Sequence, residues 1–298
     1  MQGGHGEQHY TNGKIQFLSF LNTQNMLSNK TFLITGIANK NSLAMFTAKE
    51  IIKQGGKVIC TGLGVSSHHT NLSEKAKVFL TKNFQELKLA ITEELGITAV
   101  EILDVTLDKN IESFARMLSD RSVKLDGFLH AIAMDKTIRN KKVKPLLEVT
   151  KEEFCDTMNV SAYSLIRLTH YLLKYHVLQK GASICSLSYI AAAKVTFHPY
   201  RNISIAKAAL ERITVELADE LGRSHGIRVN VVRFSPYMGS KAGNATLNKE
   251  DVETSNRMSP LGNAKPIDLA HEIVHLFRPD LSITGEIRHV DGGYHITG

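Results

Sequence analysis

The sequence of residues 31–54, TFLITGIANKNSLAMFTAKEIIKQ, decides the fold. Its first part, Thr31–Thr35, is a short apolar run without polar alternation, which is typical of a strand buried on both faces of a parallel sheet. Gly36 follows this run, and a helical spacing of apolar residues begins at Ser42 and continues to Gln54. A strand, a glycine turn and a helix in this order predict the first unit of an α/β sheet protein.

Further short runs rich in Ile, Val, Leu and Phe alternate with helical stretches along the rest of the chain. This alternation predicts one doubly wound, Rossmann-like parallel sheet of about seven strands with helices on both faces. The predicted strands are Val58–Thr61, Val100–Leu103, Gly127–Ala133, Ser183–Leu187, Arg228–Val232 and Glu286–Val290, and predicted helices include Ser161–Tyr175 and Ser204–Leu221.

The domain organisation follows from where these patterns begin. Residues 1–28 are expected to form a flexible extension with a short helix over 16–27, and residues 29–298 to form one dinucleotide-binding domain. Within that domain, residues 70–98 form an enlarged connection, where apolar residues every three or four positions predict an amphipathic helix that begins near Ser73.

Composition limits the function classes. The 298 residues are 43% hydrophobic and 22% charged, and no apolar run reaches the roughly 18 residues of a membrane-spanning helix. Cys60, Cys155 and Cys185 lie far apart without a CxxC pair, which argues against a disulfide framework or a cysteine zinc site and favours a cytoplasmic location. The net charge of +7 fits nucleic acid, a membrane surface or an acidic protein, and composition does not choose among them.

Two adjacent histidines, His68 and His69, stand in the loop before the predicted long helix. Neighbouring side chains point apart, and no further ligands stand nearby in the sequence. We therefore expect a solvated loop and no metal site.

The glycine turn after the first strand predicts a phosphate site. Gly36 lets backbone N–H groups approach a phosphate at the positive end of the following helix, near Ile37, Ser42 and Leu43. The usual fingerprint of three glycines is absent, since Ser42 and Ala44 stand where further glycines are expected. A glycine that only turns the chain between strand and helix gives the same pattern.

The ends of other predicted strands add to this site. Asp104 follows the third strand, where an aspartate can accept a hydrogen bond from an adenine amino group or, alternatively, cap a helix. The fourth strand ends in Ala131, Ile132 and Ala133, which let a cofactor lie against the backbone, whereas His130 reads as a core histidine.

The second strand says little about which cofactor binds. Its end carries neither an acidic residue for a ribose 2′-hydroxyl nor an arginine for a 2′-phosphate, which favours NADH and leaves NADPH open. His68, His69 and Lys75 could reach a phosphate from the following loop.

The strongest constellation combines Tyr189, Tyr200 and Lys207. Seven residues span about two helical turns, so Tyr200 and Lys207 share a face if their helix begins near the tyrosine. An ammonium near a phenol stabilises the phenolate and keeps the hydroxyl a good donor to developing negative charge. A surface tyrosine and a surface lysine are the alternative.

Taken together, these residues resemble the enoyl-acyl-carrier-protein reductases of bacterial type II fatty-acid synthesis, within the short-chain dehydrogenase/reductase superfamily. The resemblance runs from Asn29 to Thr297. Most short-chain dehydrogenases place the lysine four residues after the tyrosine, but Ile203 stands four residues before Lys207, so the spacing resembles that of the C=C-reducing branch. The motifs are TGIANKNSLA (35–44), Asp104-Val105, HAIA (130–133), LSY (187–189), Tyr-x6-Lys (200–207), IRVNVVRFSP (227–236), ITGE (283–286) and HVDGGY (289–294).

The resemblance implies reduction of the C=C bond of a 2-enoyl thioester with NADH. It implies that Tyr200, Lys207 and Tyr189 are catalytic, that Asp135, Tyr189 and Tyr200 border the substrate, and that residues 240–260 form a substrate-binding loop. The cofactor residues it implies are Gly36, Ile37, Ser42, Leu43, Leu63, Asp104, Val105, Ala131, Ile132, Ala133, Lys207, Pro236, Tyr237, Gly239 and Ser240.

The resemblance also implies partners. They are an enoyl substrate on an acidic acyl carrier protein, steered by cations such as Lys241 and Lys249, and further copies of the chain in a homotetramer. Dispersed solubilising charge explains the same lysines. Nucleic-acid binding and membrane insertion are not expected.

Departures from the family pattern keep two alternatives open. The segment Tyr189–Tyr200 is one residue longer than is typical, the threonine expected after Pro236 is missing, and Asp135 replaces a small apolar residue. Asn159 resembles the helix asparagine of carbonyl-reducing relatives. The alternatives are a divergent short-chain reductase acting on another enoyl or carbonyl substrate, and a binding protein that keeps the cofactor fold without catalysis.

Overall fold

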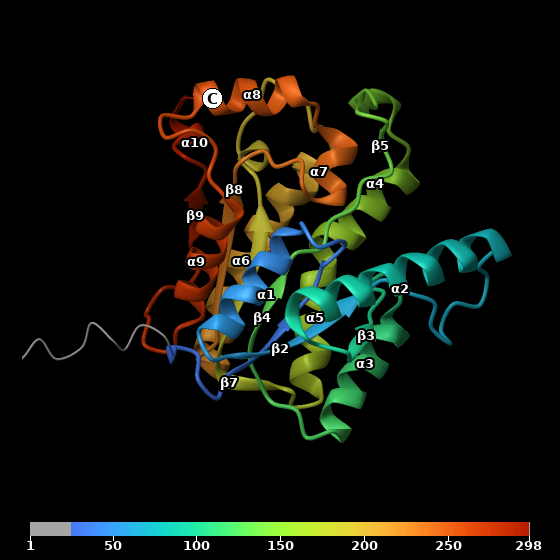
Figure 1. Cartoon of the computed structure of the whole chain (residues 1–298), viewed down its shortest axis with the longest axis vertical. Coiled ribbons are helices and arrows are strands. Elements are labelled where there is room, and N and C mark those ends of the chain that lie inside the picture. The colour runs from blue at the N-terminus through green and yellow to red at the C-terminus, as the bar shows by residue number, and fades with distance from the viewer. Residues whose placement is uncertain (1–24, 298) are drawn as a thin grey trace, which may run out of the picture.

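A computed structural model describes residues 25–297 of the chain. Seven strands form one sheet in the order β3-β2-β1-β4-β7-β8-β9, and every neighbouring pair is parallel (Figure 1). The predicted parallel sheet is confirmed, with strand ends shifted by a few residues. The strands are β1 (Thr31–Ile34), β2 (Lys57–Gly62), β3 (Val100–Ile102), β4 (Leu125–His130), β7 (Leu178–Ser188), β8 (Arg228–Phe234) and β9 (Ile287–Val290).

Helices cover both faces of the sheet, as predicted. The helices α1 (Leu43–Lys53), α2 (Glu74–Leu95) and α9 (Pro266–Phe277) share one apolar cluster with the sheet, and α3 (Asp108–Asp120), α5 (Ser164–Lys174) and α6 (Asn202–His225) share the other. Among the described residues, no helix is long and apolar enough to cross a membrane. The remaining helices are α4 (Lys151–Met158), α7 (Lys241–Thr246), α8 (Lys249–Met258), α10 (Tyr294–Thr297), the π-helix Asn159–Tyr163 and the 3₁₀ turns Leu146–Glu148 and Ile190–Ala192.

The amphipathic helix predicted near Ser73 is α2. The Ser73 side chain caps it by accepting from the Ala76 backbone N–H at 3.2 Å, and Gly96 ends it with a φ of 69°. Its buried residues Leu87 and Ile91 lie against the sheet. The short helix expected over residues 16–27 falls mostly outside the described residues, although Leu27 is fully buried in the same apolar cluster.

A small antiparallel hairpin was missed by the sequence interpretation. It pairs β5 (Ile138–Arg139) with β6 (Lys142–Val143), and its two turn residues, Asn140 and Lys141, both have positive φ values of 50° and 63°. Such turns usually carry glycine at the second position. Lys141 stands there instead, so the sequence does not show the usual hairpin pattern. The Lys141 N–H donates to the Ala245 carbonyl at 3.0 Å, which ties the hairpin to α7.

A buried ion pair fixes α6 on the sheet. The Arg233 guanidinium on β8 donates to both carboxylate oxygens of Glu211 on α6, at 2.7 and 2.6 Å, and both side chains are less than 10% exposed. The Ser188 hydroxyl at the end of β7 donates to the same carboxylate at 2.6 Å. This network joins α6 to two adjacent strands next to the predicted site.

Glu211→Leu should strongly destabilise the fold, because it leaves the buried Arg233 guanidinium without a carboxylate. We expect the free energy of unfolding to fall by about 3–5 kcal/mol. The double variant Glu211→Leu/Arg233→Met removes both charges and should recover most of that loss. Denaturant unfolding followed by circular dichroism measures both effects, and a double variant no more stable than Glu211→Leu would contradict this account.

Candidate active site

The predicted site residues gather at one edge of the sheet. Parallel strands end on the same side, and the order reverses between β1 and β4, where open α/β sheets bind their ligands. Most of the predicted residues follow a strand at that edge: Gly36 after β1, Leu63 after β2, Asp104 and Val105 after β3, Ala131–Ala133 after β4, Tyr189 after β7 and Pro236–Ser240 after β8.

Gly36 turns the chain where β1 and β4 come closest. Its φ is 76°, and a Cβ atom there would lie 2.1 Å from the Ala131 carbonyl oxygen, so only glycine fits. The Ser42 hydroxyl accepts from the backbone N–H groups of Ala38 and Asn39, both at 2.9 Å. Ser42 therefore shapes the loop between Gly36 and α1, and the cradle beside Gly36 suits the close approach of a dinucleotide phosphate.

The segment after β8 closes onto this loop. The Tyr237 hydroxyl donates to the Asn41 carbonyl at 3.0 Å, and the Asn39 side-chain amide donates to the Gly239 carbonyl at 3.3 Å. The Ser240 hydroxyl accepts from the Gly243 N–H at 3.0 Å and caps α7. The structure thus brings the two predicted cofactor segments together and gives Ser240 a capping contact of its own.

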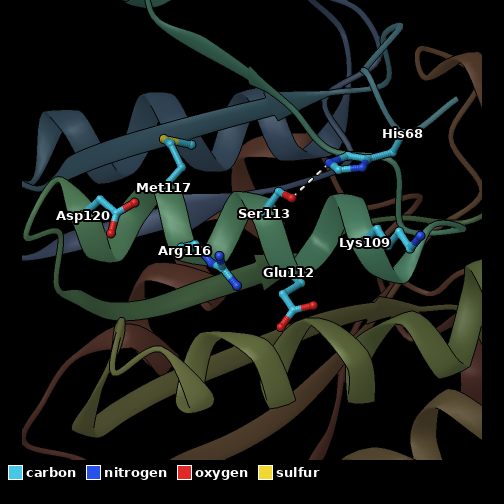
Figure 2. A pocket seen from close by; sticks show the side chains of 7 residues that line it. All are labelled: His68, Lys109, Glu112, Ser113, Arg116, Met117 and Asp120. Atoms are coloured by element: carbon cyan, nitrogen blue, oxygen red, sulfur yellow. Dashed lines mark hydrogen bonds between the residues drawn. The ribbon is translucent and has the colours of Figure 1, made fainter.

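The loop that holds the two histidines is partly exposed, as at Ser67 and Thr70, but the His69 side chain is not solvated as predicted. His69 Nε2 lies 2.9 Å from Asp104 Oδ2, and only 7% of the His69 side chain is exposed. His68 Nε2 lies 2.9 Å from the Ser113 hydroxyl on α3, beside a surface hollow along that helix (Figure 2). Both histidines attach the loop after β2 to the segment after β3.

Three tyrosines and a histidine form the centre of the site. The Tyr189 ring lies 5.0 Å from the Tyr200 ring and 6.4 Å from the Tyr294 ring, and His198 packs edge-on against Tyr200 at 5.2 Å. His198 Nδ1 lies 3.4 Å from Asp251 Oδ2 on α8. Burial raises the pKa of Tyr200 well above its usual range, and the Asp251 charge adds to this rise. Tyr200 therefore keeps its proton and acts as a hydrogen-bond donor.

Lys207 is partly buried on α6. Helix α6 begins at Asn202, after Tyr200, and Arg201 between them has a φ of 50°, so the prediction that Tyr200 and Lys207 share a helix face is wrong. Lys207 Nζ donates instead to the Leu187 carbonyl on β7 at 2.7 Å. Burial lowers the pKa of Lys207 to about 8. The expected stabilisation of the phenolate by Lys207 would lower the pKa of Tyr200. Burial raises that pKa instead.

Polar residues near the end of β4 are bonded inside the protein. His130 is fully buried with Nε2 2.8 Å from the Ser164 hydroxyl, and burial lowers its pKa to about 3, which confirms a core histidine. Asp135 Oδ1 accepts from the Thr137 backbone N–H at 2.8 Å and from the Thr157 hydroxyl at 3.3 Å, whereas its Oδ2 is buried without a protein partner. Asp135 is therefore held through its Oδ1 contacts, and its Oδ2 is not exposed.

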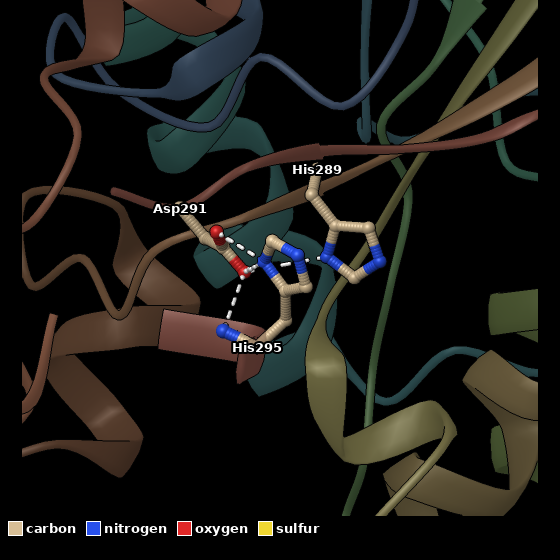
Figure 3. Close-up of side chains that lie close together, drawn as sticks. All are labelled: His289, Asp291 and His295. Atoms are coloured by element: carbon tan, nitrogen blue, oxygen red, sulfur yellow. Dashed lines mark hydrogen bonds and ion pairs between the residues drawn. The ribbon is translucent and has the colours of Figure 1, made fainter. Parts of the chain in front are cut away.

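A further cluster near the C-terminus brings together His289, Asp291 and His295 (Figure 3). Arg233 Nη1 lies 3.4 Å from His289 Nε2; arginine only donates, so Nε2 accepts and the Nδ1–H donates to Asp291 at 3.3 Å. His295 Nδ1 lies 2.9 Å from Asp291, and the two imidazole rings stack with their centroids 3.8 Å apart. These contacts describe a hydrogen-bonded cap at the start of α10, because Asp291 also accepts from the Gly293 N–H.

Four residues of this region were not among the site residues predicted from the sequence, although His69 was considered as a phosphate contact. They are His69, which contacts Asp104, and His198, Asp251 and Tyr294, which surround Tyr200. Two of them had a signal: Tyr294 ends the HVDGGY motif, and His198 lies in the segment that is one residue longer than is typical. The pairing of His198 with Asp251 joins residues more than 50 positions apart, and no local pattern marks such a contact.

Comparisons with known proteins agree with this arrangement. The family model described as enoyl-(acyl carrier protein) reductase matches residues 36–295. The enoyl-[acyl-carrier-protein] reductase [NADH] FabI of Aquifex aeolicus is 31% identical over 275 residues, which cover 92% of this chain and 94% of that protein.

Solved structures extend the likeness to three dimensions. The crystal structure of the Aquifex aeolicus enzyme has a TM-score of 0.76 at 30% identity and covers 92% of this chain and 99% of that chain. The enzyme of Anaplasma phagocytophilum, solved in complex with NAD, has a TM-score of 0.75 at 29% identity and covers 93% and 96%. The chain therefore belongs to the enoyl-(acyl carrier protein) reductase family.

Proposed function

We propose that this protein reduces the C=C bond of a 2-enoyl thioester with NADH. The observation that carries the proposal is the Tyr189–Tyr200 pair, with rings 5.0 Å apart at the sheet edge where the cofactor loop lies. The Tyr-x6-Lys spacing at 200–207, with the LSY motif at 187–189, is the sequence feature that resembles the C=C-reducing branch. The names of the relatives support this choice, since they are NADH-dependent enoyl reductases.

The residues at the sheet edge suit a dinucleotide. The cradle at Gly36 and the loops beyond β3 and β4 would hold its phosphates and adenine, and Lys207 would hold a ribose. The proposed contacts are Gly36, Ile37, Ser42, Leu43, Leu63, Asp104, Val105, Ala131, Ile132, Ala133, Lys207, Pro236, Tyr237, Gly239 and Ser240. When bound, the reduced nicotinamide supplies the hydride that adds to the β-carbon of the substrate.

The protein's own groups then stabilise the negative charge that builds on the thioester oxygen. Tyr200 is protonated because burial and Asp251 raise its pKa, so it can donate a hydrogen bond to that oxygen. Tyr189 also has a pKa raised by burial and provides a second donor. Lys207, anchored by the Leu187 carbonyl, keeps further N–H groups for the ribose hydroxyls.

The substrate side is formed by residues 240–260 and Asp135. Helices α7 and α8 make up most of that segment, and the His198–Asp251 contact links α8 to the Tyr200 loop. We propose that the substrate is carried by an acyl carrier protein, with Lys241 and Lys249 near the entrance, and that the protein works in the cytoplasm. Closure of this segment over the substrate is part of the proposal.

Tyr200→Phe should lower kcat by about a hundredfold or more, because it removes a donor to the developing oxyanion. NADH binding should stay within about twofold of the wild type, since the phenol is not a proposed cofactor contact. Loss of absorbance at 340 nm with crotonyl and longer enoyl thioesters measures the rate. A variant that keeps wild-type activity, or a wild-type protein that prefers ketones or quinones, would contradict the proposal.

NADH affinity should fall as the pH rises through about 8. Burial lowers the pKa of Lys207 from 10.5 to about 8, so the ammonium that binds the ribose is present below that pH and lost above it. Fluorescence titration from pH 6.5 to 9.5 follows the change. Lys207→Met should bind NADH weakly with no inflection near pH 8, and an unchanged inflection in that variant would assign it to another group.

We also propose that the protein is a homotetramer. One chain has a mass of 33.0 kDa, so light scattering coupled to size-exclusion chromatography should report about four times that mass. A mass equal to one chain across the micromolar range would contradict this part of the proposal.

A further inference from the structure

The contacts of His69 define its protonation. Its Nδ1 lies 3.0 Å from the Ser66 backbone nitrogen, and a backbone N–H can only donate, so Nδ1 is the acceptor. In the neutral ring Nε2 then carries the proton and donates to Asp104 Oδ2, 2.9 Å away. Because the ring is only 7% exposed, its orientation is fixed by the surrounding protein.

The two carboxylate oxygens of Asp104 differ in how many lone pairs remain for a ligand. Oδ1 accepts from the Thr106 N–H at 2.9 Å and from the Thr106 hydroxyl at 2.7 Å, which uses both of its lone pairs. Oδ2 accepts from His69 and keeps one lone pair. The carboxylate is 12% exposed, at the edge of the sheet where β3 ends. Asp104 therefore offers a ligand a single acceptor in one direction.

We propose that His69 is a positioning residue that aims Asp104 at the exocyclic amino group of adenine and makes the site selective for that base. An amino group donates to the free lone pair of Oδ2, whereas a carbonyl at the same ring position would place two acceptors against each other. Without His69, Oδ2 loses the contact that holds it, and the carboxylate can rotate about the Thr106 contacts. The inference rests on the cofactor placement of the proposed function.

His68 provides a matched control in the same loop. Its Nε2 contacts the Ser113 hydroxyl at 2.9 Å, as Figure 2 shows, and not the Asp104 carboxylate. Since His68 keeps the loop attached to α3 when His69 is replaced, we expect His69 variants to fold. Thermal unfolding of each variant checks this.

The experiment compares the binding of NADH with that of reduced nicotinamide hypoxanthine dinucleotide, in which a carbonyl replaces the adenine amino group. Calorimetry on the full chain should show that the wild type prefers NADH by about tenfold. His69→Ala should weaken NADH binding by about tenfold, leave hypoxanthine dinucleotide binding within about twofold, and so remove the preference. His69→Gln, whose amide can donate to Asp104, should restore part of it, and His68→Ala should keep it.

The outcomes separate this inference from the function on which it rests. A folded His69→Ala protein that keeps the full preference for NADH would overturn the role of His69 and leave the proposed function intact. A wild-type protein that binds both dinucleotides equally would overturn the adenine contact of Asp104, and with it the inference, although enoyl reduction would still stand. Failure of the wild type to bind either dinucleotide would overturn the proposed function itself.

Discussion

The approach of two strand ends at the centre of the sheet is the constraint on which the site depends. Gly36 after β1 lies so close to the Ala131 carbonyl after β4 that a single Cβ atom would lie 2.1 Å from that oxygen. The strand order reverses between these two strands, which is where open α/β sheets bind their ligands. Ser42 fixes the loop after Gly36 through two backbone N–H groups, and Tyr237 after β8 contacts the same loop.

The relative position of Lys207 and Tyr189 depends on how α6 packs against β7. Lys207 and Glu211 are one turn apart on the same face of α6, and they contact consecutive residues at the end of β7: Lys207 the Leu187 carbonyl, and Glu211 the Ser188 hydroxyl. Tyr189 is the next residue along the chain. Two contacts one turn apart therefore fix the position of the lysine relative to that tyrosine, and the ion pair with Arg233 holds the helix in this register.

The sheet was predictable because its signals are local. Each strand is a short run of branched and aromatic residues, and α2 shows its apolar spacing, its serine cap and its terminal glycine in the sequence itself. The arrangement of Tyr200 was not predictable in the same way. Helix α6 begins two residues after it, at Asn202, and the intervening Arg201 has a φ of 50°, a turn that no residue type there marks. The spacing of Tyr200 and Lys207 suggested that they share a helix face, but Tyr200 precedes the helix.

Burial shifts the pKa values of Tyr200 and Lys207 for the same reason, because an environment of low polarity disfavours whichever form carries charge. For Tyr200 it raises the pKa and preserves the neutral phenol, which is the form that can donate to an oxygen gaining negative charge. For Lys207 it lowers the pKa to about 8, so the lysine carries its charge at neutral pH and below and loses it as the pH rises through about 8. The charged ammonium donates to the Leu187 carbonyl. His130, buried on the neighbouring strand with a pKa lowered to about 3, adds no competing cation beside that lysine. The site thus combines a donor that resists ionisation with a single weakly held positive charge, a combination suited to stabilising negative charge as it forms rather than to removing a proton from the substrate.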